Sequence, residues 1–158
     1  MGILIAVGAS LYFLESQVFF PVPVPGARWG FSNLVVLISA VNMGLYETLT
    51  VSLGKSFVGG LLSGKFGNIG FVIGLSGSIC AGFVMWGMNK IFKNKAGYLG
   101  ISSSGAFFNN LTQIILISIV LRNKLVFYYL PYMFFLGLIS SGVNAFISAN
   151  LDRRLKKS

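Results

Sequence analysis

Long apolar runs, separated by short polar or glycine-rich breaks, dominate the hydrophobic pattern of this chain. The runs carry few charges and do not alternate polar with apolar positions, so they predict membrane-spanning helices rather than the strands of an outer-membrane barrel. We therefore expect an all-α, polytopic membrane protein with a single transmembrane domain over residues 1–151. About six spans are predicted, at residues 2–20, 31–44, 46–62, 69–91, 98–121 and 125–149.

The second predicted span is short for a bilayer that needs roughly 20 residues to cross. It must either extend back through residues 28–33 or run beside a water-filled cavity, because irregular backbone is tolerated at membrane depth only where protein or water covers it. The short span is the first indication of a site.

Composition agrees with a membrane protein. The 158 residues are 55% hydrophobic and 9% charged, with a mean hydropathy of +0.83, far from an average soluble domain. The net charge of +9 comes from 12 Lys+Arg against 3 Asp+Glu. These cations lie mainly at the ends of apolar runs, where they orient helices, so we expect no nucleic-acid partner.

The placement of the basic residues also predicts an orientation in the cell membrane. It favours both termini in the cytoplasm, with residues 152–158 forming a basic cytoplasmic tail at the lipid surface. The proline-rich stretch over residues 21–30 then faces outward.

Several kinds of catalytic chemistry lack the residues they need. Histidine is absent, Cys80 is the only cysteine, and the only acids are Glu15, Glu47 and Asp152, which are widely separated. A magnesium-bound diphosphate requires clustered carboxylates, and nucleophilic triads require a base, so we expect no enzyme, no catalytic residue, no metal and no cofactor.

Two charged residues are predicted inside the membrane. Glu15 lies near the end of the first span and Lys55 near the middle of the third. A charge in hydrocarbon costs about 2.5–3.5 kcal/mol on insertion scales, so such residues are functional candidates unless they pair. A structural ion pair of Glu15 with Lys55 or Arg28 and a direct contact with substrate are both compatible with the sequence.

The proline-rich stretch between the first two spans predicts a stiff outer cover. Pro21, Pro23 and Pro25 fix φ and remove amide donors, which disfavours helix. Arg28 offers five donors suited to a carboxylate or phosphate, and Trp29 offers a flat stacking surface, although the pair would also serve as an interfacial anchor. Asn33, at the start of the short span, shifts the interpretation toward a binding site.

The fifth span carries a cluster of amides. Asn109 and Gln113 are four residues apart and share a helix face, with Asn110 beside them. They either hold helices together or contribute to a site. Three isolated asparagines are interpreted as packing or helix-end residues: Asn68, Asn144 and Asn150.

Small residues at four-residue spacing predict close helix packing. One such seam holds Gly70, Gly74 and Ser78. Another stripe lies on one face of the first helix, where it would pack internally or dock a partner helix: Gly2, Ala6 and Ser10.

The order of these motifs resembles a known membrane family. Glu15, then PVPGARWGFSN at 23–33, NNLTQ at 109–113 and YYLP at 128–131 are similar to the family called Gx transporter or heptaprenyl diphosphate synthase component I. The similarity covers nearly the whole chain. The family motifs read Pro-Gly-x-Lys-Leu-Gly-Leu-Ala-Asn and His-Asn-x-Gly-Gln, so Arg28 stands in place of a lysine and Asn109 in place of a histidine.

This family is similar in turn to the substrate-binding S components of energy-coupling-factor transporters. The resemblance implies a substrate held under the loop between helices one and two, a coupling membrane subunit that contacts the stripe on the first helix, and separate ATPase subunits. Our leading hypothesis is a membrane subunit that captures a small, anionic or amide-bearing solute. The candidate binding residues are Glu15, Arg28, Trp29, Asn33, Lys55, Asn109, Asn110 and Gln113.

Two other interpretations stay open. In the first, the chain is a non-catalytic accessory subunit of an assembly for isoprenoid or quinone synthesis, or for flavin-linked electron transfer. The polar residues would then be structural. In the second, the chain is a self-sufficient channel, which would require a continuous polar lane through a bundle whose inner halves are largely apolar.

Overall fold

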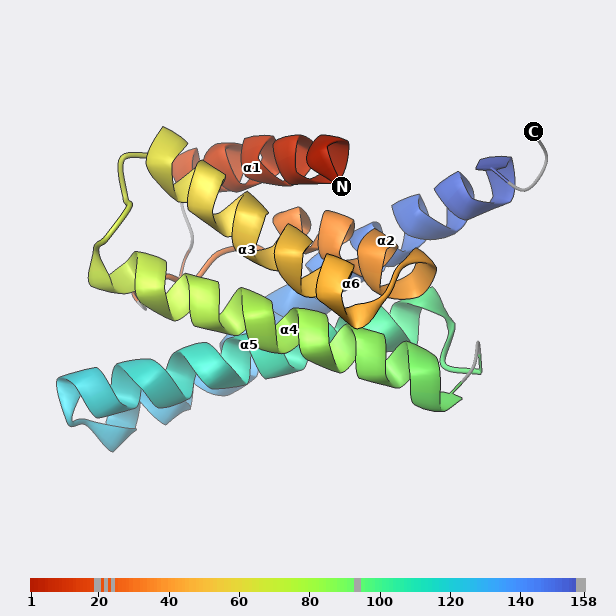
Figure 1. Cartoon of the computed structure of the whole chain (residues 1–158). Helices are drawn as coiled ribbons and strands as arrows, with labels where there is room; N and C mark the ends of the chain where they lie inside the picture. Colours follow the sequence, from red (N-terminus) through yellow and green to blue (C-terminus); the bar gives the residue numbers. More distant parts are fainter. Residues whose placement is uncertain (19–20, 22, 24, 93–94, 156–158) are drawn as a thin grey trace.

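The structure is a computed structural model that describes residues 1–18, 21, 23, 25–92 and 95–155 (Figure 1). Within these residues the chain is helical and contains no strand. Its elements in order are α1 (Gly2–Gln17), the 3-10 turn η1 (Phe31–Asn33), α2 (Leu34–Asn42), α3 (Leu45–Leu62), α4 (Ile69–Phe92), α5 (Gly97–Leu121), the 3-10 turn η2 (Lys124–Tyr129) and α6 (Leu130–Leu155).

These helices follow the predicted segments closely. The bounds of α3, α4 and α5 agree with the predictions to within one residue. The described part of the first helix ends at Gln17, and residues 19–20, 22 and 24 of the predicted first span and loop lie outside the described residues. Glycine, proline and lysine residues separate the apolar runs, so the sequence predicts the ends of these helices accurately.

The sixth helix begins later than predicted, at Leu130 rather than at residue 125. Residues Lys124–Tyr129 form a 3-10 turn instead, and the side chain of Asn123 caps its start by accepting a hydrogen bond from the backbone N–H of Leu125 (2.9 Å). Pro131 explains the restart, because a proline is tolerated in the first turn of a helix but clashes with the preceding turn in its interior.

Among the residues that the structure describes, three helical segments are long and apolar enough to cross a membrane: Ile69–Phe92, Gly97–Leu121 and Lys124–Arg154. The Gly2–Gln17 and Phe31–Asn42 segments are apolar but shorter. Large apolar side chains point outward from several helices, including Ile3, Ile91 and Phe146, each more than 70% exposed. A membrane-embedded helical bundle accounts for that surface, and six spans remains a prediction.

Both described ends of the chain lie at one end of the bundle, at the right in Figure 1, together with the α2–α3 and α4–α5 connections. The loop that follows α1 and the α3–α4 and α5–η2 connections lie at the opposite end, which we call the loop end. Residues 152–155, predicted as the start of a separate tail, continue α6; residues 156–158 lie outside the described residues.

Two apolar clusters make up the core. The cluster toward the loop end includes Ile73 of α4 and Ile114 of α5, and the cluster toward the termini includes Ala81 of α4 and Ile101 of α5. Between them, α4 and α5 carry small and polar residues. The core is therefore interrupted by a polar layer, and that layer holds the candidate site.

Candidate functional site

A hydrogen-bonded chain of polar groups joins α1, η1 and α3. The backbone N–H and hydroxyl of Ser32 donate to the two carboxylate oxygens of Glu15, at 3.2 and 2.8 Å. The ammonium of Lys55 donates to Ser32 Oγ at 3.4 Å and to Asn33 Oδ1 at 2.7 Å. All four side chains are at least 93% buried. Glu15 and Lys55 were predicted as a possible ion pair, and in the structure the hydroxyl of Ser32 bridges them through two hydrogen bonds.

These hydrogen-bonded groups lie at the start of α2, a helix of nine residues. Because η1 leads directly into α2, the Glu15 carboxylate lies at the positive end of the Phe31–Asn42 helical segment, where a negative charge is favoured. The predicted short second span is therefore a buried half-helix. Its irregular approach is covered by protein, as membrane depth requires.

Arg28 enters the same region from the loop. Its guanidinium carbon lies 3.5 Å from the centre of the Tyr12 ring, a close cation–π contact. One of its nitrogens, Nη1, is buried without a hydrogen-bond partner among the described residues. A Cβ on Gly74 would lie 2.7 Å from Arg28 Nη2, so glycine at this position makes room for the guanidinium on α4.

The three amide side chains of α5 face two different directions. Asn109 and Gln113 face the polar layer, and Gln113 Oε1 is buried with no hydrogen-bond partner in the described structure. Asn110 instead donates from Nδ2 to the Met133 carbonyl of α6 at 2.8 Å, while its Oδ1 accepts from Asn109 at 3.3 Å. One residue is a turn of about 100° on a helix, so Asn110 cannot share the face of the other two amides.

Except for Asn110 and Tyr12, these groups line a small cavity, which we call the polar cavity. Its volume is about 10 Å3, room for about one water molecule. Its lining contains one acid and two cations, a formal excess of one positive charge. The lining residues are Glu15, Arg28, Gly30, Ser32, Asn33, Lys55, Gly74, Ser78, Asn109 and Gln113.

The polar cavity lies well below the loop end. Lys55 is seven residues before the end of α3, and Ser78 is nine residues after the start of α4. At 1.5 Å per residue these offsets correspond to depths of about 10–14 Å. Any solute that binds there has to pass the loop that follows α1.

Two contacts hold that loop over the cavity. Gly26 has φ of +83°, and a Cβ there would lie 2.5 Å from the Gly70 carbonyl oxygen, so the loop backbone rests directly on α4. Asn144 of α6 donates from Nδ2 to the Gly30 carbonyl at 3.0 Å. At Gly70 and Gly74, the seam predicted for helix packing therefore receives the loop and Arg28.

A larger space lies outside the polar cavity, at the loop end. It has a volume of about 360 Å3, and Tyr12, Arg28, Lys65 and Asn68 are among its lining residues. We call it the vestibule. Arg28 lines both spaces, so its side chain lies between the vestibule and the polar cavity.

Trp29 turns away from the polar cavity. Its ring is stacked near Phe31, with the ring centres 6.4 Å apart, and both rings line a separate apolar groove of about 370 Å3 on the α1 side. Among the predicted binding residues, Trp29 and Asn110 are the two that do not line the polar cavity.

The small-residue stripe on α1 faces outward, since Gly2, Ala6 and Ser10 are exposed. The inward-facing small residue is Gly8, where a Cβ would lie 2.6 Å from Val35 Cγ2 and 2.9 Å from Lys55 Cβ. The stripe is thus not used for packing within the described bundle.

Three residues of the site were missed from the sequence: Tyr12, Ser32 and Asn144. Tyr12 and Ser32 are ordinary in composition, and their partners are distant in the chain. Asn144 was interpreted as an isolated packing residue, although its position on the long final helix, opposite a loop that must be anchored, was a usable signal. Within the described residues, no three His, Cys, Asp or Glu side chains gather as a metal site would require.

The comparison with protein families agrees with the resemblance found in the motifs. The family model described as "Heptaprenyl diphosphate synthase component I" matches residues 4–151. The chain belongs to this family. The match runs from the first turn of α1 to the last turns of α6 and includes every residue of the polar cavity. No curated protein and no solved structure matches the chain.

Proposed function

We propose that this member of the heptaprenyl diphosphate synthase component I family is a non-catalytic membrane subunit that binds a small anionic solute in the polar cavity. The observation that carries the proposal is the convergence of rare polar groups from α1, the following loop and η1, α3, α4 and α5 on one buried point. Helix packing alone does not require an excess charge at such a point, since a buried uncompensated charge is destabilising.

The unused groups of the cavity define what the solute would offer. Among the described residues, Arg28 Nη1 is a donor without a hydrogen-bond partner, and the ammonium of Lys55 has three donors of which two are used. These groups suit a carboxylate or phosphate. Gln113 Oε1 is an acceptor that also has no hydrogen-bond partner in the described part of the chain, and it suits an N–H or O–H on the same solute.

Binding requires the loop to move, because the polar cavity holds no more than about one water. Arg28 would leave the Tyr12 ring and turn toward the solute, and the vestibule would give the solute access. In the transport form of this proposal, the subunit works with a coupling membrane subunit and ATPase subunits, and the outward stripe of α1 docks the former.

Arg28 provides the direct test. The full chain, purified gently in detergent, is analysed by mass spectrometry for retained small molecules, alongside the Arg28→Ala and Lys65→Ala variants. Lys65 is the matched control, because it is a cation of the vestibule that does not line the polar cavity. We expect an anionic compound on the wild type and on Lys65→Ala, and its loss from Arg28→Ala. Equal retention by both variants would refute the proposal.

The family description favours a second candidate function. It names a component of a prenyl diphosphate synthase, so the chain would be the accessory membrane partner of a synthase component that supplies the Asp-rich magnesium site. The polar cavity would then be structural. Co-purification with a prenyltransferase whose activity depends on this chain supports that role, and co-purification with paired ATPases supports transport instead.

A further inference from the structure

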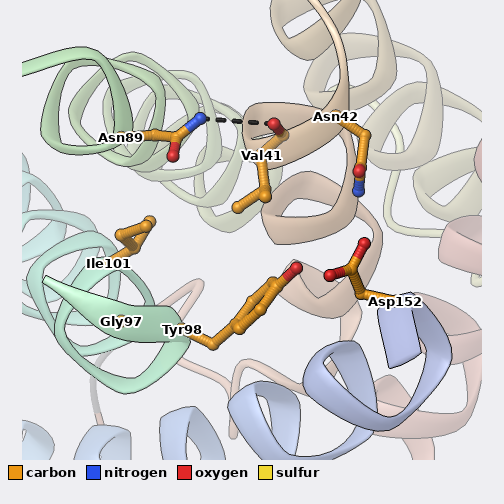
Figure 2. Close-up of a pocket in the computed structure, with 7 residues that line it drawn as sticks. All are labelled: Val41, Asn42, Asn89, Gly97, Tyr98, Ile101 and Asp152. Carbon is orange, nitrogen blue, oxygen red and sulfur yellow. Dashed lines mark hydrogen bonds between the residues drawn. The ribbon is translucent and has the colours of Figure 1, made fainter. Parts of the chain in front are cut away.

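A second polar pocket lies at the opposite end of the bundle, near the end of α6 (Figure 2). We call it the end pocket. Its volume is about 390 Å3, against about 10 Å3 for the polar cavity. Its lining includes Val41 and Asn42 at the end of α2, Asn89 near the end of α4, Tyr98 and Ile101 at the start of α5, and Asp152 near the end of α6. A ligand there would contact four helices, and the function proposed above uses none of these residues.

Hydrogen-bond acceptors dominate the polar groups of this pocket. Asn89 donates from Nδ2 to the carbonyls of Ala40 and Val41, at 3.1 and 3.3 Å, which leaves its Oδ1 for the pocket (Figure 2). Asn42 donates from Nδ2 to the Ile38 carbonyl at 3.0 Å. Both amides therefore use an N–H group on an α2 carbonyl, and Asn89 keeps its carbonyl oxygen for a ligand.

The electrostatics of the pocket favour a positive group. The Asp152 carboxylate faces the pocket and is hydrogen-bonded to the Tyr98 hydroxyl (Figure 2). A carboxylate has more acceptor positions than this one bond uses. Val41 and Asn42 form the C-terminal end of α2, which is the negative end of its helix dipole. The Tyr98 ring supplies an aromatic wall of the kind that receives organic cations. An ammonium group satisfies all of these features.

Basic residues near this pocket favour a zwitterion over a bare cation. Arg153 and Arg154 follow Asp152 directly, both are exposed, and Lys90 lies on the neighbouring end of α4 with its ammonium 6.0 Å from the Trp86 ring. These groups repel an isolated cation but attract an anion attached to it.

We propose that the end pocket binds a zwitterionic amine-phosphate group, with the ammonium at Asp152 and Asn89 and the phosphate toward Arg153 and Arg154. This chemistry occurs in the headgroup of an amine-bearing phospholipid and in a free phosphoamine. Exposed apolar side chains near the same end, Ile91, Leu99 and Leu151, would accept the acyl chains of a lipid. In the lipid form of this proposal, the end pocket and these apolar side chains together bind one phospholipid molecule.

The test uses the full chain in detergent with three probes: phosphatidylethanolamine, phosphatidylglycerol and phosphoethanolamine. Native mass spectrometry measures retained lipid, and isothermal calorimetry measures the soluble probe. We expect phosphatidylethanolamine to be retained in preference to phosphatidylglycerol, which lacks the amine. Binding of phosphoethanolamine alone, without lipid retention, assigns the same chemistry to a soluble ligand. Failure of both amine probes, or equal retention of the two lipids, overturns the proposal.

Two variants and a control localise the binding. Asp152→Asn should weaken binding by about tenfold, since it removes one charge-assisted hydrogen bond. Asn42→Lys, at an exposed position, places an ammonium in the pocket and should abolish binding. Glu47→Gln is the matched control, because Glu47 is an acid in the first turn of α3, at the same end, that does not line the pocket. Wild-type binding by both folded pocket variants would overturn the proposal.

Discussion

The polar cavity and the end pocket place charge in the bundle in opposite ways. In the polar cavity, Glu15 and Lys55 are almost fully buried and bonded to each other through Ser32, and the space between the groups is about 10 Å3. In the end pocket, Asp152 is partly exposed and the space is about 390 Å3. Buried charges lose their hydration and depend on their partners, whereas exposed charges remain solvated.

Because of this difference, substitutions at the two sites should affect protein stability to different degrees. Substitutions in the polar cavity should change the stability of the protein and ligand binding together. Substitutions in the end pocket should change ligand binding with little change in stability.

The largest effect is expected from Glu15→Gln. Loss of the one acid in the lining of the polar cavity leaves Lys55 and Arg28 without a counter-charge, and an uncompensated buried charge typically costs about 3–5 kcal/mol. The free energy of unfolding, measured in mixed detergent micelles, should fall by that amount, whereas Asp152→Asn should change it by less than about 1 kcal/mol.

The double variant Glu15→Gln/Lys55→Met is the control for this comparison. With both groups neutralised, Arg28 is the charge left in the lining, so the formal excess returns to the one positive charge of the wild type and part of the lost stability should return. A Glu15→Gln variant as stable as the wild type would erase the contrast between the two sites.

A smaller effect is expected where the loop rests on α4. Gly26→Ala places a Cβ 2.5 Å from the Gly70 carbonyl at φ of +83°, and Gly64→Ala places one at φ of +65° with no atom within 4 Å. Both variants carry the penalty of about 1 kcal/mol for a positive φ. Only Gly26→Ala adds steric strain of about 1–3 kcal/mol.

The pair of glycine variants measures the loop contact itself, as the difference between their unfolding free energies. Gly26→Ala should also weaken solute retention, since it displaces the loop that carries Arg28. Equal destabilisation by the two variants would mean that the loop is not held against α4.

The tether at Asn144 should have a still smaller effect. Asn144→Leu removes the donor to the Gly30 carbonyl and leaves a partly buried acceptor unsatisfied, at a cost of about 1 kcal/mol. Hydrogen exchange at the backbone amides of residues 26–32 should become faster, because the loop opens more often.

Asn150→Leu serves as the comparison on the same helix, since Asn150 makes no side-chain hydrogen bond within the described part of the chain. Unchanged exchange in Asn144→Leu would show that Gly30 is held by other contacts.

The smallest effect on stability belongs to the outward stripe of α1. Ala6 is exposed, so Ala6→Leu should change the unfolding free energy by less than about 0.5 kcal/mol. If the stripe docks a partner helix, the same variant should lose that partner on co-purification. Gly8→Ala tests the opposite face and should be destabilising, because its Cβ meets Val35 and Lys55.

Most of the fold could be predicted from the sequence, because apolar runs and their breaks are local signals. The start of α6 was wrong because the apolar pattern runs unbroken through the 3-10 turn before Pro131. The six predicted spans are only partly supported, since three segments meet the length and apolarity that crossing requires.

The candidate site was predictable in part, because charge and amide groups are rare in a membrane helix. Glu15, Arg28 and Lys55 stand out for that reason, and the structure places them around one cavity. Asn144 and Ser32 did not stand out, since their roles depend on partners 114 and 17 residues away. Asn110 was grouped with its neighbours by proximity in the sequence, although helix geometry turns it toward α6.

The short helix α2 connects the polar cavity to the end pocket. The segment that begins at η1 has Ser32 and Asn33 in the polar cavity and ends with Val41 and Asn42 in the end pocket. At 1.5 Å per residue, α2 is a stiff rod of about 14 Å with a binding site at each tip. A ligand that shifts this rod at one tip changes the geometry at the other, and thermodynamic linkage makes the influence mutual. The lipid composition around the protein would thereby set its affinity for the solute.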